Sequence, residues 1–441
     1  MTPKLGFEGF SDWECVRLGD VAKRVTRKNK DNETDIPLTI SSLDGLVDQR
    51  TYFGKTVAGK DMSGYYLLKK GEFAYNKSYS VGFDFGSIKR LDDYEMGALS
   101  TLYICFALNN GVNSDFFVKY FDSQKWYKSV QAICAEGARN HGLLNVPTDG
   151  FFDMVLCIPK VEAEQQKIAD FLTAYDEKVS LQQQKVEALE KRKKGLLQKV
   201  FSQELRFKAD DGSEFQEWEE KCFADFSVQT GKRNKDKIRY DIYAITNKYG
   251  FISQAEAHDE FAYMKDADIS AYNIVSPYSF GYNPARINVG SIGYYEGENN
   301  VLVSSLYEIF QTNEQIIARF LLYWFKTSIF QKWVEKLQEG SVRLYFYYDK
   351  LCECRIAIPC LEEQQKIADF FSAIDEQIGL EKQRLEAMQT VKKGLLQQMF
   401  CDGSEAEEEE HTGAAAIYQL HPQASTLQAA QPDVEYNRSG Q

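Results

Sequence analysis

The chain has 441 residues, of which 44% are hydrophobic and 27% are charged, and this length suits two or more globular domains. Its 52 Lys and Arg stand against 65 Asp and Glu, and a net charge of −13 over the whole chain argues against a nucleic-acid binder. No apolar stretch approaches about 18 residues and the start lacks a secretory signal, so we expect a cytoplasmic protein without a membrane span. Nine scattered cysteines without a CxxC pair, and only four histidines, favour free thiols and predict no metal site.

Residues 1–160 form the first of two variable segments, and residues 206–360 form the second. The two segments share short motifs in the same order, roughly 205 residues apart. They are Trp13-Glu14 and Trp218-Glu219, the basic runs 27–30 and 232–235, FAYNK 73–77 and FGYNP 280–284, and STLY 100–103 and SSLY 304–307. This period is far above the roughly 20 to 50 residues of solenoid repeats, so each segment is predicted to be a complete domain.

Residues 161–205 are predicted to form a long helix, and residues 361–400 are a second copy of it. The motif EQQKIADF occurs at 164–171 and again at 363–370, and 22 of the 38 residues aligned from there are identical. In both copies apolar residues recur at alternating steps of four and three, which is the heptad pattern of a coiled coil. The predicted seam is Ile168, Leu172, Tyr175, Val179, Val186 and Leu189 in the first helix, and Ile367, Phe371, Ile374, Ile378, Leu385 and Met388 in the second.

The connectivity of the chain predicts how these helices pair. The first helix leads from the first domain to the second and the second helix leaves the second domain, so we predict an antiparallel pair with an internal pseudo-two-fold repeat. Each helix would be about 60 Å long. Other apolar residues widen the stripe beyond the seam, and we expect helices of partner proteins to cover them, with contact to the chain's own domains as the alternative. They are Phe171, Leu181, Leu197, Phe370, Leu380 and Leu396.

Residues 401–441 form an acidic tail that we predict to be disordered. The tail carries eight acidic residues and one basic residue, so it accounts for −7 of the net −13. The remaining chain is only mildly acidic. Because contact with phosphates needs local positive charge, the acidic total no longer excludes DNA.

Taken together, these motifs resemble the specificity subunit of type I restriction-modification enzymes. The resemblance covers about residues 12–401, and its most specific part is EQQKIADF with the following Asp176 and Asp375, each copy preceded by Ile-Pro and followed by KKGLLQ. It implies a mixed α/β (α+β) fold with two target recognition domains separated by the antiparallel helices. It also implies that each domain reads one half of a bipartite, asymmetric DNA sequence and that the helices set the spacer between the halves.

The resemblance further implies which partners and cofactors to expect. The partners are double-stranded DNA, two methyltransferase subunits that dock on the helices, and two restriction subunits that translocate DNA. S-adenosylmethionine, ATP and Mg²⁺ are expected on those subunits, with no cofactor and no catalytic residue on this chain. In agreement, the sequence has no GxxxxGK[ST] loop, and NPAR at Asn283 lacks the second proline and the aromatic residue of the NPP[YF] motif.

Candidate DNA contacts follow from the chemistry that DNA recognition needs. Phosphate contacts are predicted from the basic clusters Arg27, Lys28 and Lys30 in the first domain and Lys232, Arg233 and Lys235 in the second. Base contacts need Arg, Lys, Asn or hydroxyl side chains on loops, which selects Asn76, Lys77, Tyr79, Lys89, Arg139, Tyr282, Asn283, Arg286 and Arg343. Solvated loops and ordinary turn chemistry are the alternatives for these residues.

Two other functions stay open from the sequence alone. The chain could be a coiled-coil adaptor that positions two protein partners and never binds DNA, in which case its binding would depend little on salt. It could also be a self-contained methyltransferase, although the sequence offers no cofactor loop for that activity.

Overall fold

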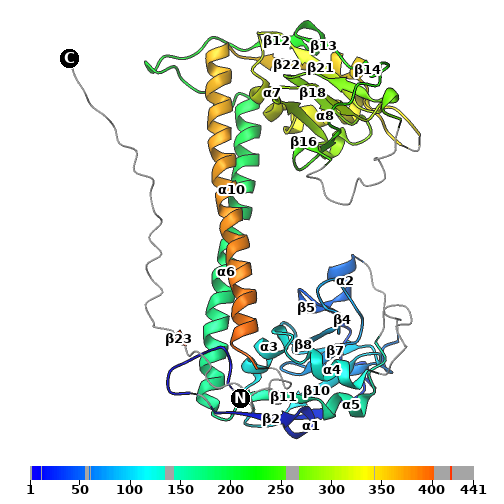
Figure 1. The fold of residues 1–441 in the computed structure, drawn as a ribbon, viewed down its shortest axis with the longest axis vertical. Helices are drawn as coiled ribbons and strands as arrows, with labels where there is room; N and C mark the ends of the chain where they lie inside the picture. The colour runs from blue at the N-terminus through cyan, green and yellow to red at the C-terminus, as the bar shows by residue number, and fades with distance from the viewer. Residues whose placement is uncertain are drawn as a thin grey trace, which may run out of the picture. The chain divides into compact units, whose positions relative to one another are not determined.

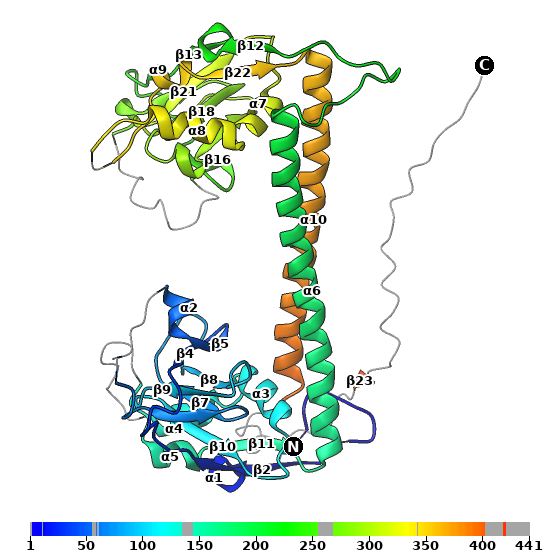
Figure 2. The same cartoon turned by 180° about the vertical axis from the view of Figure 1, so that it is seen from behind.

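A computed structural model describes residues 2–10, 12–54, 59, 61–134, 144–254, 268–341 and 343–401, together with the backbone of residues 418–419. Its contacts divide the chain into two compact units, of which the first holds residues 1–181 and 385–441 and the second holds residues 182–384. Each unit combines one β-rich domain with one half of each long helix (Figures 1 and 2). Within the described residues, no helix is long and apolar enough to cross a membrane.

The first unit contains two four-stranded sheets. One has the order β3-β10-β7-β8, with strands Ala22–Arg24, Ile104–Leu108, Phe73–Asn76 and Ser87–Arg90. The other has the order β5-β4-β9-β6, with strands Gly45–Asp48, Pro37–Ser41, Met96–Leu99 and Tyr66–Lys69. Two further pairs are β2 (Trp13–Arg17) with β11 (Val155–Pro159) and β1 (Leu5–Gly6) with β23 (Tyr418–Gln419). The short helices are α1 (Leu18–Val21), α2 (Gln49–Phe53), α3 (Ser114–Asp122), α4 (Tyr127–Ile133) and α5 (Thr148–Asp153).

Strand β7 shows why the first unit has a core on each side of one sheet. Its sequence FAYN places Phe73 and Tyr75 on one face and Ala74 on the other, because successive side chains of a strand point to opposite faces. Phe73 and Tyr75 belong to the large core that includes the helices, whereas Ala74 belongs to a smaller core with residues of the second sheet. The sheet β3-β10-β7-β8 is therefore buried on both faces.

The second unit repeats this arrangement. Its main sheet has the order β13-β21-β18-β19, with strands Ser227–Gln229, Glu308–Thr312, Ser279–Tyr282 and Ile292–Tyr295. A three-stranded sheet joins β14 (Lys232–Arg233), β17 (Asn273–Val275) and β20 (Val301–Val303), and two pairs join β15 (Tyr243–Thr246) with β16 (Gly250–Ser253) and β12 (Glu219–Cys222) with β22 (Arg355–Ile358). The helices are α7 (Ala318–Trp324), α8 (Ser328–Leu337) and α9 (Tyr348–Cys352), with 3₁₀ turns η1 (Phe223–Asp225), η3 (Ile269–Ala271) and η4 (Ile287–Val289). The predicted mixed α/β fold with two tandem domains is confirmed.

Two long helices, α6 (Glu162–Phe201) and α10 (Leu361–Gln398), pair in antiparallel fashion within each unit, as predicted (Figures 1 and 2). In the first unit, Asp176 near the start of α6 forms an ion pair of 2.6 Å with Lys392 near the end of α10. In the second unit, Lys193 near the end of α6 pairs with Asp375 near the start of α10. All twelve predicted seam residues are buried or half-buried.

The polar residues that interrupt the seam form hydrogen bonds or ion pairs with the opposite helix. Gln182 and Glu381 occupy equivalent positions in the two helices, and the Gln182 amide donates hydrogen bonds of 2.7 Å to the Glu381 carboxylate and 3.0 Å to its carbonyl oxygen. The other two interruptions, Lys193 and Lys392, are the lysines of the ion pairs just described. Sliding one helix along the other would break all three pairings at once, so these residues specify the register.

The apolar residues beside the seam mostly contact the chain's own domains, and the prediction that partner helices cover them is wrong for four of the six. Leu197 and Leu396 are buried in the two large cores, Phe171 stacks edge-on against Phe7, and Phe370 against Phe207. The exceptions are Leu181 and Leu380, which are 64% and 60% exposed. These two leucines are equivalent positions of the repeat.

The repeated motif EQQKIADF anchors each helix to its domain. Its glutamate accepts a hydrogen bond of 3.0 Å from a tryptophan indole in both copies, Glu164 from Trp13 and Glu363 from Trp218. The next glutamine donates to the carbonyl of the preceding proline, over 2.8 Å in the first copy and 3.0 Å in the second. The similarity of the two copies therefore reflects identical contacts at the domain-to-helix junction.

The two anchor glutamates, Glu164 and Glu363, differ in their charge environment, and this difference leads to a prediction. Glu164 is 1% exposed, no cation pairs with it among the described residues, and burial raises its pKa. Glu363 is fully buried too, but it forms an ion pair of 3.0 Å with Arg206. Because the pKa of Glu164 is raised in the folded state, its protonated form stabilises the fold below the unfolded pKa of about 4.3. This stabilisation is lost as the pH rises through the folded-state pKa.

We therefore expect Glu164→Gln to become more stable relative to the wild type as pH rises from 4 to 7. Glu363→Gln is the matched control, and it should lower the free energy of unfolding by about 2 kcal/mol at neutral pH because it removes the buried carboxylate that pairs with Arg206. Urea denaturation followed by circular dichroism at several pH values measures both effects. Equal losses for the two variants at pH 7 would contradict the assignment.

Candidate nucleic-acid interface

A loop with the same construction carries the basic residues of each domain. Asn29 is fully buried, and its side chain donates to the Thr34 carbonyl over 3.0 Å and accepts from the Thr34 amide over 3.2 Å. Asn234, its counterpart 205 residues later, is 1% exposed and makes the same two bonds to Ile238, over 2.9 and 3.0 Å. A buried asparagine therefore closes both loops and holds their basic residues in place.

The two loops also share an unusual backbone conformation. Asn32 and Lys237 are again equivalent positions, and both adopt left-handed backbone angles, with φ of 49° and 52°. Each donates its amide to the carbonyl of the buried asparagine over 3.0 Å. A left-handed conformation is uncommon outside glycine, so its occurrence at both positions indicates one shared loop fold.

Three of the six predicted phosphate contacts are engaged within the protein. Arg27 forms a two-pronged ion pair with Glu72 at 2.8 and 2.9 Å. Lys28 donates to the Gly64 carbonyl over 2.9 Å and lies 4.1 Å from the centre of the Tyr66 ring. Its counterpart Arg233 donates over 2.6 Å to the carbonyl of Ala271.

The other three cations face solvent. Lys30, Lys232 and Lys235 are exposed, and within the described parts of the chain no hydrogen bond or ion pair holds their side chains. These three lysines are therefore the part of the basic loops that is available to an anionic partner. The tertiary structure thus divides a cluster that looked uniform in the sequence.

The predicted base contacts are also divided by the structure. Asn76 and Asn283 each accept a hydrogen bond of 3.0 Å from the amide two residues later, which is the turn chemistry considered as the alternative. Lys89 pairs with Asp122 at 2.7 Å, and Lys77 is half-buried. The exposed candidates are Tyr79, Arg286 and Arg343, whereas Arg139 lies outside the described residues.

Tyr282 is a wrong prediction. Its side chain is 0% exposed, it belongs to the large core of the second unit, and its hydroxyl has no hydrogen-bond partner among the described residues. Its counterpart in β7, Tyr75, is equally buried and donates to the Phe85 carbonyl over 2.8 Å. The alternation of large residues in FAYN and FGYN already indicated that both tyrosines point inward.

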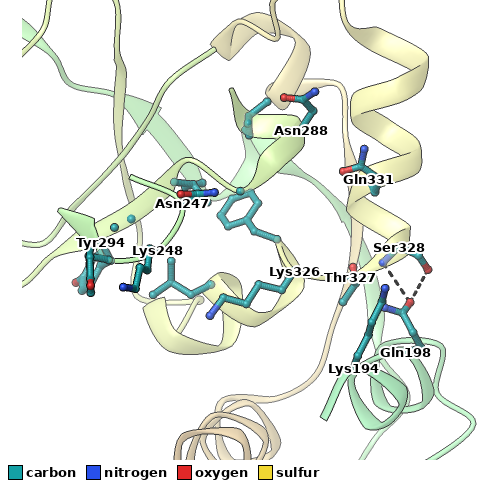
Figure 3. A pocket seen from close by; sticks show the side chains of 18 residues that line it. Lys194, Gln198, Asn247, Lys248, Asn288, Tyr294, Lys326, Thr327, Ser328 and Gln331 are labelled. Atoms are coloured by element: carbon teal, nitrogen blue, oxygen red, sulfur yellow. Dashed lines mark hydrogen bonds between the residues drawn. The ribbon is translucent and has the colours of Figure 1, made fainter. Parts of the chain in front are cut away.

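The structure also shows a hollow that the sequence did not reveal. It has a volume of about 690 Å³ and lies in the second unit between the end of α6, the turn of the β15–β16 hairpin and the junction of α7 with α8 (Figure 3). Its lining includes Lys194, Asn247, Lys248, Lys326 and Gln331. These residues come from segments far apart in the sequence, so no local motif marks them.

Comparison with known proteins assigns the chain to a family. The family described as "Type I restriction modification DNA specificity domain" matches residues 10–191 and again residues 216–390, which together exceed half of the chain. The chain therefore belongs to this family, and the resemblance stated from its motifs is confirmed. Specificity subunits are the non-catalytic chains of type I restriction-modification enzymes, and DNA target recognition is their role.

Individual relatives agree with this assignment. The chain is 22% identical over 402 residues to the type I restriction enzyme MjaVIII specificity subunit of Methanocaldococcus jannaschii, covering 87% of this chain and 91% of that protein. It is 27% identical over 226 residues to the putative MjaX specificity subunit of the same organism, covering 46% and 50%. A solved structure from a study of assembly and conformational transition of the type I R-M system has the same fold, with a TM-score of 0.55 at 15% identity over 88% of this chain and 97% of that one.

The buried loop asparagines lead to a prediction about stability and binding. Asn29→Ala should lower the free energy of unfolding by about 2 kcal/mol, because it leaves two buried backbone groups of Thr34 without partners. Asn234→Ala should lower it by less, because the backbone groups that it releases belong to the exposed Ile238. Both should weaken DNA binding without changing its dependence on salt, since no charge is lost.

The matched variants are Lys30→Gln and Lys235→Gln, which remove a charge and keep the loop. Each should leave the unfolding midpoint unchanged and reduce the slope of log affinity against log salt by about 1. Fluorescence anisotropy with a labelled duplex gives the slope. Unaltered unfolding midpoints in the two alanine variants would refute the proposed role of the asparagines in closing the loops.

Proposed function

We propose that each domain reads one half of a bipartite, asymmetric target in double-stranded DNA and that α6 and α10 set the spacer between the halves. The observation that carries this proposal is the asparagine-closed basic loop, which occurs once in each domain with the same hydrogen bonds and the same backbone conformation. Two copies of one phosphate-binding device in a single chain fit a protein that contacts one duplex at two places.

The differences between the two domains support an asymmetric target. Position 28 carries a lysine where position 233 carries an arginine, and the exposed Tyr79 stands where the second domain has the exposed Arg286. Base edges are distinguished by such side chains, because Arg favours guanine and hydroxyl groups are more permissive. A shared scaffold with different surface side chains would read two different half-sites.

The partners follow from the same proposal. Two methyltransferase subunits and two restriction subunits would assemble with this chain, and S-adenosylmethionine, ATP and Mg²⁺ would bind to them. Leu181 and Leu380 support docking on the helices, since they are exposed large apolar residues at equivalent positions of the repeat.

A coiled-coil adaptor without DNA contact is the less favoured alternative. An adaptor would need neither the outward-facing Lys30, Lys232 and Lys235 nor a device that fixes them in place. The affinity of the adaptor for its partners would also change little with salt, whereas phosphate contacts demand a steep loss.

Co-expression with a partner methyltransferase tests the proposal directly. We expect adenine methylation at one bipartite asymmetric sequence, detected by long-read sequencing of the host DNA. Exchange of residues 206–360 for the domain of another family member should change one half of that sequence and leave the other half intact. A stable complex that methylates no defined sequence would refute the proposal.

The role of the helices has its own test. Insertion of seven residues beside the Gln182–Glu381 pair in both helices keeps the seam in phase and lengthens the pair by about 10 Å. The recognised spacer should grow by about three base pairs, at 3.4 Å per pair, with both half-sites unchanged. Insertion in α6 alone is the control, and it should abolish methylation because the ion pairs on the two sides of the insertion, Asp176–Lys392 and Lys193–Asp375, can no longer form together. A constant spacer in the double insertion would show that the helices do not set it.

A further inference from the structure

The hollow in the second unit has an unusual charge. Three of its lining residues are lysines, Lys194 from α6, Lys248 from the hairpin turn and Lys326 from the segment between α7 and α8. None of the described residues that line it is Asp or Glu. In Figure 3 the side chain of Lys326 extends toward the hairpin turn that carries Asn247 and Lys248, while Lys194 enters from the helix.

The first unit has a hollow at the equivalent place, which allows a direct comparison. The hairpins β4–β5 and β15–β16 pair in the same register, Ser41 opposite Gly45 and Thr246 opposite Gly250, so turn residues 42–44 correspond to 247–249. The helix junctions correspond as well, since the hydroxyls of Ser123 and Thr327 each donate to the carbonyl three residues earlier, over 2.6 and 2.7 Å. Position 122 is therefore the counterpart of position 326.

The counterpart hollow of the first unit is small and has more acidic than basic residues. Its volume is about 200 Å³, and four aspartates, Asp44, Asp92, Asp93 and Asp122, line it together with Lys89 and Arg90. Lys89 pairs with Asp122 at 2.7 Å, and Arg90 pairs with Asp92 at 2.6 Å. Both cations of this hollow are thus neutralised by carboxylates of the same chain.

The second unit replaces three of these charged groups, Lys89, Arg90 and Asp122. The strand register places Gly293 and Tyr294 where the first unit has Lys89 and Arg90, and Lys326 stands in place of Asp122. A side chain at position 293 would meet the hairpin backbone at 2.9 Å, so the hairpin excludes a lysine there. The result is a larger hollow with an excess of positive charge at a place where the first unit has internal ion pairs.

The surroundings of Lys326 favour an anion. Although part of its side chain reaches solvent, desolvation by the surrounding protein and the nearby Lys193 lower its pKa, with Asp375 opposing them. A bound anion would offset this cost by pairing with the charged form. The Gln198 side chain accepts from the Ser328 amide over 3.1 Å and thereby connects α6 to the wall of the hollow.

We propose that this hollow binds a backbone phosphate of duplex DNA, a contact that the second unit makes and the first unit lacks. The inference rests on the proposed function and adds to it a site that no motif indicates. A volume of about 690 Å³ accommodates a phosphate with its adjoining sugar. Lys194 and Lys326 supply the charge, and the amides of Asn247 and Gln331 supply further donors.

The test compares salt dependence in the full-length chain. Lys194→Gln combined with Lys326→Gln should reduce the slope of log affinity against log salt by about 1 on a random-sequence duplex, because backbone contacts are independent of sequence. Lys326→Asp, which introduces the residue of the first unit, should weaken binding more than Lys326→Gln. The matched control is Lys393→Gln, an exposed lysine equivalent to Lys194 in the repeat, which should leave slope and affinity unchanged.

Each outcome decides a separate point. Equal slopes for the wild type and the double variant, with unchanged unfolding midpoints, would overturn this inference and leave the proposed function intact. Failure of the wild type to bind any duplex would overturn the proposed function instead. If the slopes are equal but calorimetry shows that a free mononucleotide binds the wild type and not the double variant, the hollow takes a small ligand and the assignment to DNA is wrong.

Discussion

Three polar pairings between α6 and α10 determine how the rest of the molecule is organised. A seam made only of apolar residues would allow several registers, because apolar packing has little directional preference. Gln182 with Glu381, Lys193 with Asp375 and Lys392 with Asp176 can all form in one register only. The register decides which part of the partner helix enters each core, namely the end of α10 in the first unit and the end of α6 in the second.

The duplication uses one scaffold twice and changes what the scaffold presents. The anchor of the helix, the core on each side of the main sheet and the asparagine-closed loop recur with matching contacts. The charges around that scaffold do not recur. Within the described ranges, Glu164 lacks the cation that Glu363 has in Arg206, and Asp122 is replaced by Lys326. Two domains built on one scaffold can therefore offer DNA different surfaces.

The sequence predicted well wherever the signal was local. The seam, the duplicated helices, the antiparallel pairing and the mixed fold follow from heptad spacing and connectivity, because burial along a helix is a periodic property. Local spacing failed for single side chains. Tyr282 has the polar group of a DNA contact but is buried, and the amides of Asn76 and Asn283 are used by their own turns. Four of the six apolar residues beside the seam serve the chain's own cores rather than a partner.

The sequence by itself determined the duplication, the two long helices, the family and the loops that carry positive charge. Only the tertiary structure decided which of those charges remain available. Arg27 is neutralised by Glu72, which is 45 residues away, whereas Lys30 faces solvent a few positions further on. The hollow around Lys326 gathers residues from α6, a hairpin and a helix junction. The period of a helix or strand can be recognised from neighbouring residues. The partner of a charged side chain is set by long-range packing, which the sequence alone does not show.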